Sequence, residues 1–89
     1  MGKITFAERG WQDYLYWQSQ DRKTVKKINE LLKDISRNGP LAGIGKPESL
    51  TGSLSGCYSR RIDDKNRLVY QISENNEIEV AQCIGHYND

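Results

Sequence analysis

The alternation of apolar and polar residues along the chain predicts two helices near the start and strands after them. Apolar side chains recur at helical spacing over about residues 7–20, and again in a segment that follows Asp21. Asp21 is a favourable N-cap residue, and Gly39 followed by Pro40 predicts the end of the second helix. Because the link between the two segments is short, we expect an antiparallel helical hairpin.

The rest of the chain shows strand-like segments, one before the helices and three after them. They are expected at about residues 3–6, 57–63, 67–73 and 78–85. The resulting order is β-α-α-β-β-β, in which an antiparallel meander follows the helices. Runs of helices followed by runs of strands predict an α+β fold, with the helical hairpin on one face of a mostly antiparallel sheet. We expect residues 1–89 to form a single domain.

Residues 59–70 are predicted to form a β-hairpin with one apolar and one basic face. If Ile62 lies opposite Leu68, the apolar residues share one side of the sheet. Arg61 and Arg67 then lie side by side on the other. The two arginines are either a phosphate-binding pair or solvated surface charges, and the alternation alone does not distinguish these.

This register also predicts the turn of the hairpin. Asp63 would face Arg67, Arg61 would face Val69, and three residues ending at Asn66 would form the connection. Loops of that length need a left-handed last residue, and asparagine tolerates this conformation.

Residues 39–56 contain five glycines and are predicted to be a long loop. Gly45–Lys46 is reminiscent of a phosphate-binding P-loop, but Pro40 and Pro47 stand where that motif requires glycine and a hydroxyl residue. Long ordered loops in small domains are often functional, and Glu48 is the only acidic residue in this one.

Composition narrows the possible functions. The formal net charge is +1, so any work on nucleic acid would require a local cationic patch or a larger assembly. No apolar run is long enough to span a membrane and no signal peptide is evident, so we expect a cytoplasmic protein. Cys57 and Cys83 are expected to be reduced and buried. With His86 as the single histidine, a closed zinc site lacks ligands, and we expect no metal or cofactor.

One set of polar residues is suited to cleaving RNA through its own 2′-hydroxyl group. Glu48 can accept the hydroxyl proton, and His86 can protonate the leaving 5′-oxygen. Arg61 and Arg67 carry planar cations suited to the charge that develops on phosphate. Tyr87 could stack on a base or orient the phosphate. The sequence by itself does not show that these groups converge.

Over nearly its whole length the chain resembles the YoeB toxins of the RelE superfamily, the ribosome-dependent mRNA interferases of type II toxin–antitoxin systems. The matching segments are residues 11–18 (WQDYLYWQ), 26–34 (KKINELLKD), 45–48 (GKPE), 54–56 (LSG), 59–62 (SRRI), 67–70 (RLVY) and 86–87 (HY). The resemblance implies a microbial RNase-like (RelE-like) fold and cleavage of mRNA in the ribosomal A site. It also implies inhibition by a YefM-type antitoxin, binding of operator DNA through the complex in autorepression, and a homodimer.

The resemblance further implies roles for particular residues. The catalytic residues would be Glu48 as general base, His86 as general acid, Arg67 as transition-state stabiliser, and Tyr87, which also contacts the substrate. The other substrate-binding residues would be Lys46, Arg61 and Arg60.

The chain departs from the family pattern at a few positions. Thr51 stands where a lysine is common, Cys57 where an aromatic residue is common, and the chain continues past the His-Tyr pair by Asn88 and Asp89. The carboxylates of this tail are expected to favour the protonated form of His86.

Three other functions remain open. The first is a non-catalytic protein that binds an antitoxin and operator DNA. The second is a small ribosome-independent RNase, which would be expected to have a more basic surface than a net charge of +1 provides. The third is an α+β interaction domain whose arginines are only solvated.

Overall fold

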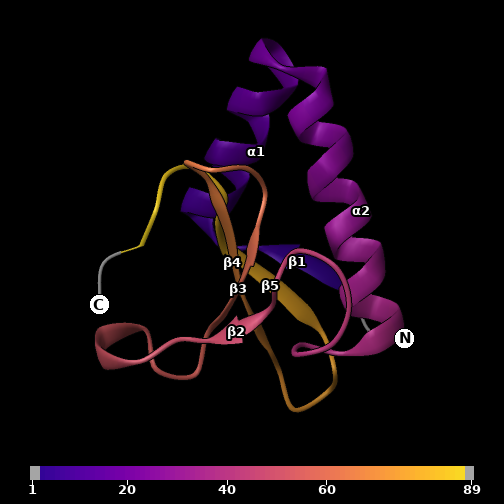
Figure 1. Cartoon of the computed structure of the whole chain (residues 1–89), viewed down its shortest axis with the longest axis vertical. Helices are drawn as coiled ribbons and strands as arrows, with labels where there is room; N and C mark the ends of the chain where they lie inside the picture. Colours follow the sequence, from indigo (N-terminus) through magenta and orange to yellow (C-terminus); the bar gives the residue numbers. More distant parts are fainter. Residues whose placement is uncertain (1–2, 88–89) are drawn as a thin grey trace.

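The computed structural model describes residues 3–87, in which two helices accompany a five-stranded sheet (Figure 1). The elements are β1 (Ile4–Phe6), α1 (Glu8–Gln20), α2 (Arg22–Asn38), β2 (Glu48–Ser49), the 3₁₀ turn η1 (Gly52–Leu54), β3 (Tyr58–Arg61), β4 (Arg67–Ile72) and β5 (Ile78–Gln82). Asn88 and Asp89, and with them their expected influence on His86, lie outside the described residues.

The structure contains the helical hairpin that the sequence pattern predicted. The Asp21 side chain caps α2 by accepting hydrogen bonds from the backbone N–H groups of Lys23, at 3.0 Å, and Thr24, at 3.4 Å. Gly39 follows the last residue of α2 with a φ of 88°, and its N–H donates to the Ile35 carbonyl at 2.9 Å. Capping at both ends therefore sets the limits of α2 where the sequence predicted them.

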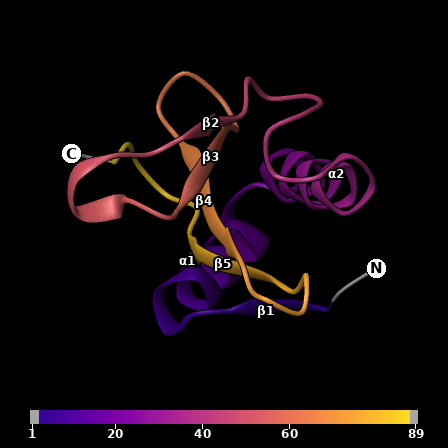
Figure 2. The same cartoon turned by 90° about the horizontal axis from the view of Figure 1, so that it is seen from below.

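The sheet has the strand order β1-β5-β4-β3-β2 (Figure 2). β1 pairs with β5 in parallel, and the other neighbours are antiparallel, so the sheet is mostly antiparallel as predicted. The sequence pattern missed β2, because a two-residue edge strand is too short to show alternation. Residues 39–56 are thus a loop interrupted by a short strand and a 3₁₀ turn.

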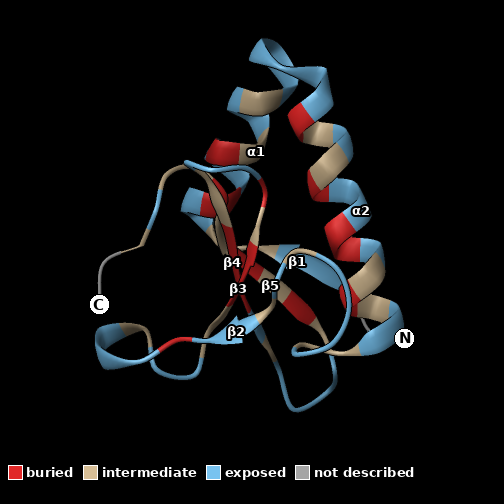
Figure 3. Cartoon of the chain, viewed as in Figure 1, coloured by how far each residue is buried: buried red, intermediate tan, exposed pale blue. Residues whose placement is uncertain are grey.

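The core lies between the helical hairpin and one face of the sheet. Its buried members on α2 and the strands are Ile28, Leu31, Leu32, Ile35, Leu68, Tyr70, Ile78 and Val80, and Ile62 and Cys83 join them directly after β3 and β5. Figure 3 shows buried residues along α2 and the central strands. From α1 and β1, the half-buried side chains of Phe6, Tyr14 and Trp17 pack against this cluster. No helix within residues 3–87 is both long and apolar enough to cross a membrane.

The predicted register of the β3–β4 hairpin is wrong by two residues. Arg61, not Asp63, pairs with Arg67, and residues 62–66 form the connection. The Asp63 carboxylate organises this longer turn by accepting from the backbone N–H groups of Lys65 and Asn66, both at 2.8 Å. Asn66 is not left-handed, since the described non-glycine residues with positive φ lie elsewhere. An even shift leaves each side chain on its predicted face.

The two cysteines are both free thiols. Cys83 is buried as expected, whereas Cys57 is only half-buried. Burial, and then the nearby charge of Asp13, raise the pKa of the Cys83 thiol to about 12. Cys83 is therefore a protonated core residue and not a nucleophile.

Candidate functional site

The strand register places a carboxylate and two guanidinium groups on the face of the sheet that the helices leave open. Glu48 on β2 pairs with Ser59 on β3, and Arg61 on β3 pairs with Arg67 on β4. Side chains two residues apart on a strand share a face, so Ser59 and Arg61 point the same way. The core residue Leu68 points the opposite way.

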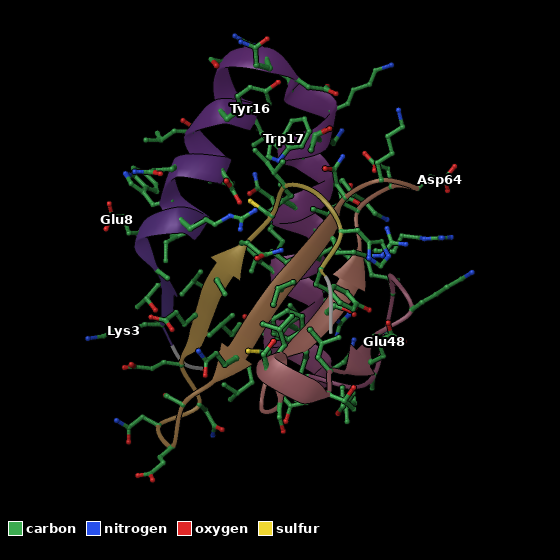
Figure 4. All side chains as sticks on the ribbon, turned by 90° about the vertical axis from the view of Figure 1, so that its left-hand side faces the viewer. Lys3, Glu8, Tyr16, Trp17, Glu48 and Asp64 are labelled. Carbon is green, nitrogen blue, oxygen red and sulfur yellow. The ribbon has the colours of Figure 1, made fainter. Side chains whose placement is uncertain are left out.

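These side chains line one shallow depression. Its walls are Lys46, Glu48, Ser59, Arg61 and Arg67. In Figure 4 the strands lie in front of α2, and Glu48 is labelled near the edge of the sheet that β2 forms. The depression therefore combines an exposed carboxylate with three cations. Ser59 was not predicted to belong to the site, although it lies on the same face of the strand as Arg61.

The paired arginines leave positive charge available for a ligand. Like charges directly opposite each other on neighbouring strands destabilise a sheet. Within residues 3–87 neither Arg61 nor Arg67 forms an ion pair with a carboxylate. Nη1 of Arg67 instead donates to the backbone carbonyls of Asp63, at 2.6 Å, and Asn66, at 3.1 Å. Such an arrangement is suited to binding a phosphate, which would relieve the repulsion.

The structure contradicts the prediction that Arg60 contacts substrate. Arg60 has no exposed surface, because it pairs with Leu68 and points into the core between the sheet and the helices. The sequence did contain this signal, since Arg60 shares the apolar phase of Ile62 and Tyr70.

Every polar atom of the Arg60 guanidinium is bonded within the protein. It donates to Tyr70 Oη (3.0 Å), Asp34 Oδ2 (2.5 Å) and the carbonyls of Ile44 (2.9 Å), Gly39 (2.8 Å) and Ala42 (2.7 Å). The hydrogen bond from Arg60, followed by that from the Ile44 N–H, holds the pKa of the Asp34 carboxyl below its usual value. Arg60 thus fastens the loop after α2 to the sheet.

Lys46 owes its position to the same loop. The Arg61 N–H donates to the Gly45 carbonyl at 2.7 Å, directly before Lys46. Lys46 itself has a left-handed backbone, with a φ of 51°. The bond at Gly45 holds the backbone of this segment, and the Lys46 side chain therefore lies at the rim of the depression.

Tyr87 reaches the depression from the far end of the sequence. Its hydroxyl donates to Oε1 of Glu48 and accepts from Ser59 Oγ at 3.4 Å. The hydrogen bond to the Glu48 carboxylate raises the pKa of the Tyr87 hydroxyl, since losing the proton would place two negative charges together. Tyr87 and Glu48, which are 39 residues apart, therefore converge.

His86 lies beside Tyr87 and is exposed to solvent. The two ring centroids are 4.8 Å apart, and Nδ1 of His86 lies 3.0 Å from the Tyr87 carbonyl oxygen. The structure thus brings Lys46, Glu48, Arg61, Arg67 and Tyr87 into one site, with His86 next to Tyr87. No cluster of three or more His, Cys, Asp or Glu side chains suited to a metal ion occurs in the described part of the chain.

The two-helix hairpin on a five-stranded mixed sheet defines the RelE-like α+β fold. Residues 6–87 match the family described as YoeB-like toxin of bacterial type II toxin–antitoxin system. The chain belongs to this family.

Individual relatives agree with this assignment. Toxin YoeB of Streptomyces coelicolor is 49% identical over 85 residues, which cover 96% of this chain and 99% of the relative. A crystal structure of the heterotetrameric YoeB–YefM complex from Staphylococcus aureus contains a chain that is 54% identical, with a TM-score of 0.89 and coverage of 98% and 99%. The YoeB dimer from the same species gives 55% identity, a TM-score of 0.90 and coverage of 97% and 98%.

Proposed function

We propose that this toxin is a ribosome-dependent mRNA interferase, an endoribonuclease that cuts mRNA in the ribosomal A site. The observation that carries the proposal is the meeting of the Glu48 carboxylate, the Arg61–Arg67 pair and the Tyr87 hydroxyl on one open face of the sheet. Cleavage of RNA by its 2′-hydroxyl requires a base, cations and an acid, and His86 beside Tyr87 supplies the acid.

The reaction begins with proton transfer to Glu48. As the carboxylate removes the proton from the 2′-hydroxyl, the 2′-oxygen attacks the adjacent phosphorus and the bond from phosphorus to the 5′-oxygen breaks. The products are a 2′,3′-cyclic phosphate and a free 5′-hydroxyl. No redox step or metal ion is needed for this balance.

The cationic and acidic groups act on the other side of the phosphate. Arg67, held by its bonds to the hairpin carbonyls, stabilises the negative charge that develops on the phosphate oxygens, and Arg61 binds the same phosphate or its neighbour. His86 donates the proton to the leaving 5′-oxygen. Lys46 contacts the RNA backbone at the rim of the depression.

Tyr87 has two roles in this scheme. Its hydroxyl holds Glu48 while the site is empty, and it exchanges that bond for a contact with the RNA when the 2′-hydroxyl reaches the carboxylate. The ring, which lies against His86, offers a surface on which a base can stack.

The partners follow from the family and from the charge of the chain. A net charge of +1 favours a nuclease that receives its RNA from the ribosome and does not attract it from solution. Because a relative at 54% identity forms a heterotetramer with YefM, we propose a YefM-type antitoxin as inhibitor, with operator DNA bound through the complex. A homodimer is proposed on the example of the Staphylococcus aureus YoeB dimer. The cytoplasm, where mRNA is translated, is the proposed location.

The test is cleavage of a defined mRNA with and without 70S ribosomes. Wild type should cut only with ribosomes, and His86→Ala or Glu48→Gln should lose on the order of a hundredfold or more in rate. Glu74→Gln, which removes an exposed carboxylate from the β4–β5 turn, is the matched control and should retain full activity.

Two results would contradict the proposal. Cutting without ribosomes would indicate a general small RNase. No cutting under either condition, with antitoxin and operator binding intact, would indicate a regulator that lacks catalysis.

A further inference from the structure

The segment that carries His86 and Tyr87 lies outside the sheet. β5 ends at Gln82, and residues 83–87 have no strand assignment. Catalytic groups must be held to within a fraction of an ångström to act well, and loops rarely achieve this without support. Tyr87 is held by its bonds to Glu48 and Ser59, and the contacts of residues 83–85 support the other side of His86.

Helix α1 holds the beginning of this segment. The buried Asp13 accepts from the Cys83 N–H at 2.9 Å, and Nε1 of Trp17 donates to the Cys83 carbonyl at 2.8 Å. Both bonds lie at the border of the core, where they fix Cys83. Arg9, also on α1, makes a longer and exposed hydrogen bond of 3.4 Å from Nη2 to the Ile84 carbonyl, so the contacts of α1 end one residue before Gly85.

The hairpin turn between β3 and β4 holds the next part. The Gly85 N–H donates to Oδ1 of Asn66 at 2.7 Å, and the Arg67 N–H donates to the Gly85 carbonyl at 3.0 Å. Gly85 has a φ of 81°, so the chain turns sharply there, immediately before His86. Two adjacent residues of the hairpin thus bind both backbone groups of Gly85.

The orientation of the Asn66 amide is determined by Asp63. Nδ2 of Asn66 donates to both carboxylate oxygens of Asp63, each at 3.1 Å. An ionised carboxylate can only accept, so the NH₂ group must face Asp63 and the amide oxygen must face Gly85. Asparagine is therefore specifically suited to this position, where one end must donate and the other must accept.

We propose that Asn66 is a positioning residue, which holds the segment bearing His86 and Tyr87 against the site through its bond to Gly85. Its catalytic consequence rests on the function proposed above, whereas its anchoring role does not. Asn66 joins the hairpin that presents Arg67 to the segment that presents His86. The cation and the acid therefore keep a constant separation, without contact between Asn66 and the RNA.

Asn66→Ala tests the anchor directly. In the protein free of RNA, exchange of the Gly85 amide proton, followed by NMR, should accelerate about tenfold, because the bond to Oδ1 is lost. In the ribosome assay kcat should fall about 10- to 100-fold with KM changed less than about twofold, since positioning and not binding is impaired. The control is Asn75→Ala, the same substitution at an exposed residue in the β4–β5 turn, which should change neither quantity.

An exchange of the two side chains gives a sharper test. Asn66→Asp alone places two carboxylates together and should lose activity as Asn66→Ala does. The double variant Asp63→Asn with Asn66→Asp restores a donor facing an acceptor and should recover most of kcat and of the protection at Gly85. Recovery of the Gly85 protection together with kcat ties the activity to the bond between the side chain at position 66 and the Gly85 N–H, which a purely turn-stabilising pair would not protect.

The outcomes separate this proposal from the proposed function. Unchanged Gly85 exchange in Asn66→Ala, or equal kcat for Asn66→Ala and wild type, would overturn the positioning role. If wild type does not cut RNA while Asn66→Ala still exposes the Gly85 amide, the nuclease proposal fails and the anchor stands.

Discussion

Arg60 and Arg61 are adjacent residues with the same side chain and opposite surroundings. Arg60 is fully buried and bonded to five groups, while Arg61 lines the open depression. The cause is the two-residue period of a strand, which sends neighbours to opposite faces. A residue's role here is decided by its phase on the strand more than by its chemistry.

Replacing Arg60 with lysine should destabilise the fold. Lysine keeps the charge but lacks the planar fork, so several of the loop carbonyls would lose their donors in a buried place. We expect the free energy of unfolding, measured by urea denaturation, to fall by about 2–3 kcal/mol. Arg61→Lys is the control and should change it by less than about 0.5 kcal/mol. Equal effects of the two substitutions would refute the distinction.

The fold should also lose stability in acid through two carboxylates. The pKa of Asp34 is lowered, chiefly by the hydrogen bond from Arg60. For Asp63, burial acts to raise the pKa, but the bonds from Asn66 and from the backbone N–H of Lys65 outweigh it and the net shift is downward.

Groups with lowered folded-state pKa values contribute stability that is present above their unfolded pKa, about 3.9, and is lost as the pH falls through the folded value. The urea concentration at the midpoint of unfolding should therefore not change with pH near neutrality and should decline below about pH 4. Asp34→Asn should make that decline shallower. A midpoint that stays constant down to pH 2.5, or a decline unaffected by Asp34→Asn, would contradict this expectation.

At the scale of elements, α1 packs closely against β5 at Gly10. A Cβ atom at Gly10 would lie 2.2 Å from the Val80 carbonyl oxygen, so only glycine permits the helix to approach the strand this far. The same close approach brings Asp13 and Trp17 within reach of Cys83. The position of α1 therefore affects the position of His86 and Tyr87, because α1 holds the start of the segment that carries them.

Gly10→Ala should reverse the usual effect of this substitution. In an exposed helix interior, alanine is more favourable than glycine by about 1 kcal/mol. Here α1 would have to move away from backbone atoms that cannot yield, and we expect a net loss of about 1–3 kcal/mol in the free energy of unfolding. Thermal denaturation of Gly10→Ala measures this loss, and Gln12→Ala, at an exposed position of α1, is the control. A Gly10→Ala protein that is more stable than wild type would show that the helix is free to shift.

At the scale of the whole molecule, the charges nearly cancel while the site remains cationic. The chain has 13 basic and 12 acidic residues, yet Lys46, Arg61 and Arg67 gather around one depression. A protein of this kind has little long-range attraction for RNA but can bind phosphates that are delivered to it.

Binding to free RNA should accordingly be weak and only moderately dependent on salt. With three site cations, the slope of log K against log salt for a single-stranded RNA should be about −2, and the dissociation constant should exceed about 1 μM at physiological salt. Fluorescence anisotropy with a 2′-O-methylated RNA, which cannot be cut, measures both. Arg61→Gln with Arg67→Gln should reduce the slope by about 1.4. A slope steeper than about −4 in wild type would show that cations outside the depression also bind RNA.

Much of this protein follows from sequence pattern. The helical stripes, the cap at Asp21, the glycine at the end of α2 and the face shared by Arg61 and Arg67 are all local or periodic signals, and each was predicted. The family resemblance also rested on local motifs, and the match over residues 6–87 confirmed it. Such features are determined by neighbours along the chain, which the sequence displays directly.

Other features were decided only by tertiary structure. The turn at Asp63 decided the register of the hairpin. Arg60 could be buried because the loop after α2 brings backbone carbonyls to it. The edge strand β2 is only two residues long and forms by pairing with β3. The bond between Tyr87 and Glu48 and the bond from Gly85 to Asn66 join segments that are far apart in the chain. Contacts of this kind depend on how the elements pack in three dimensions, and no local pattern of residues encodes that packing.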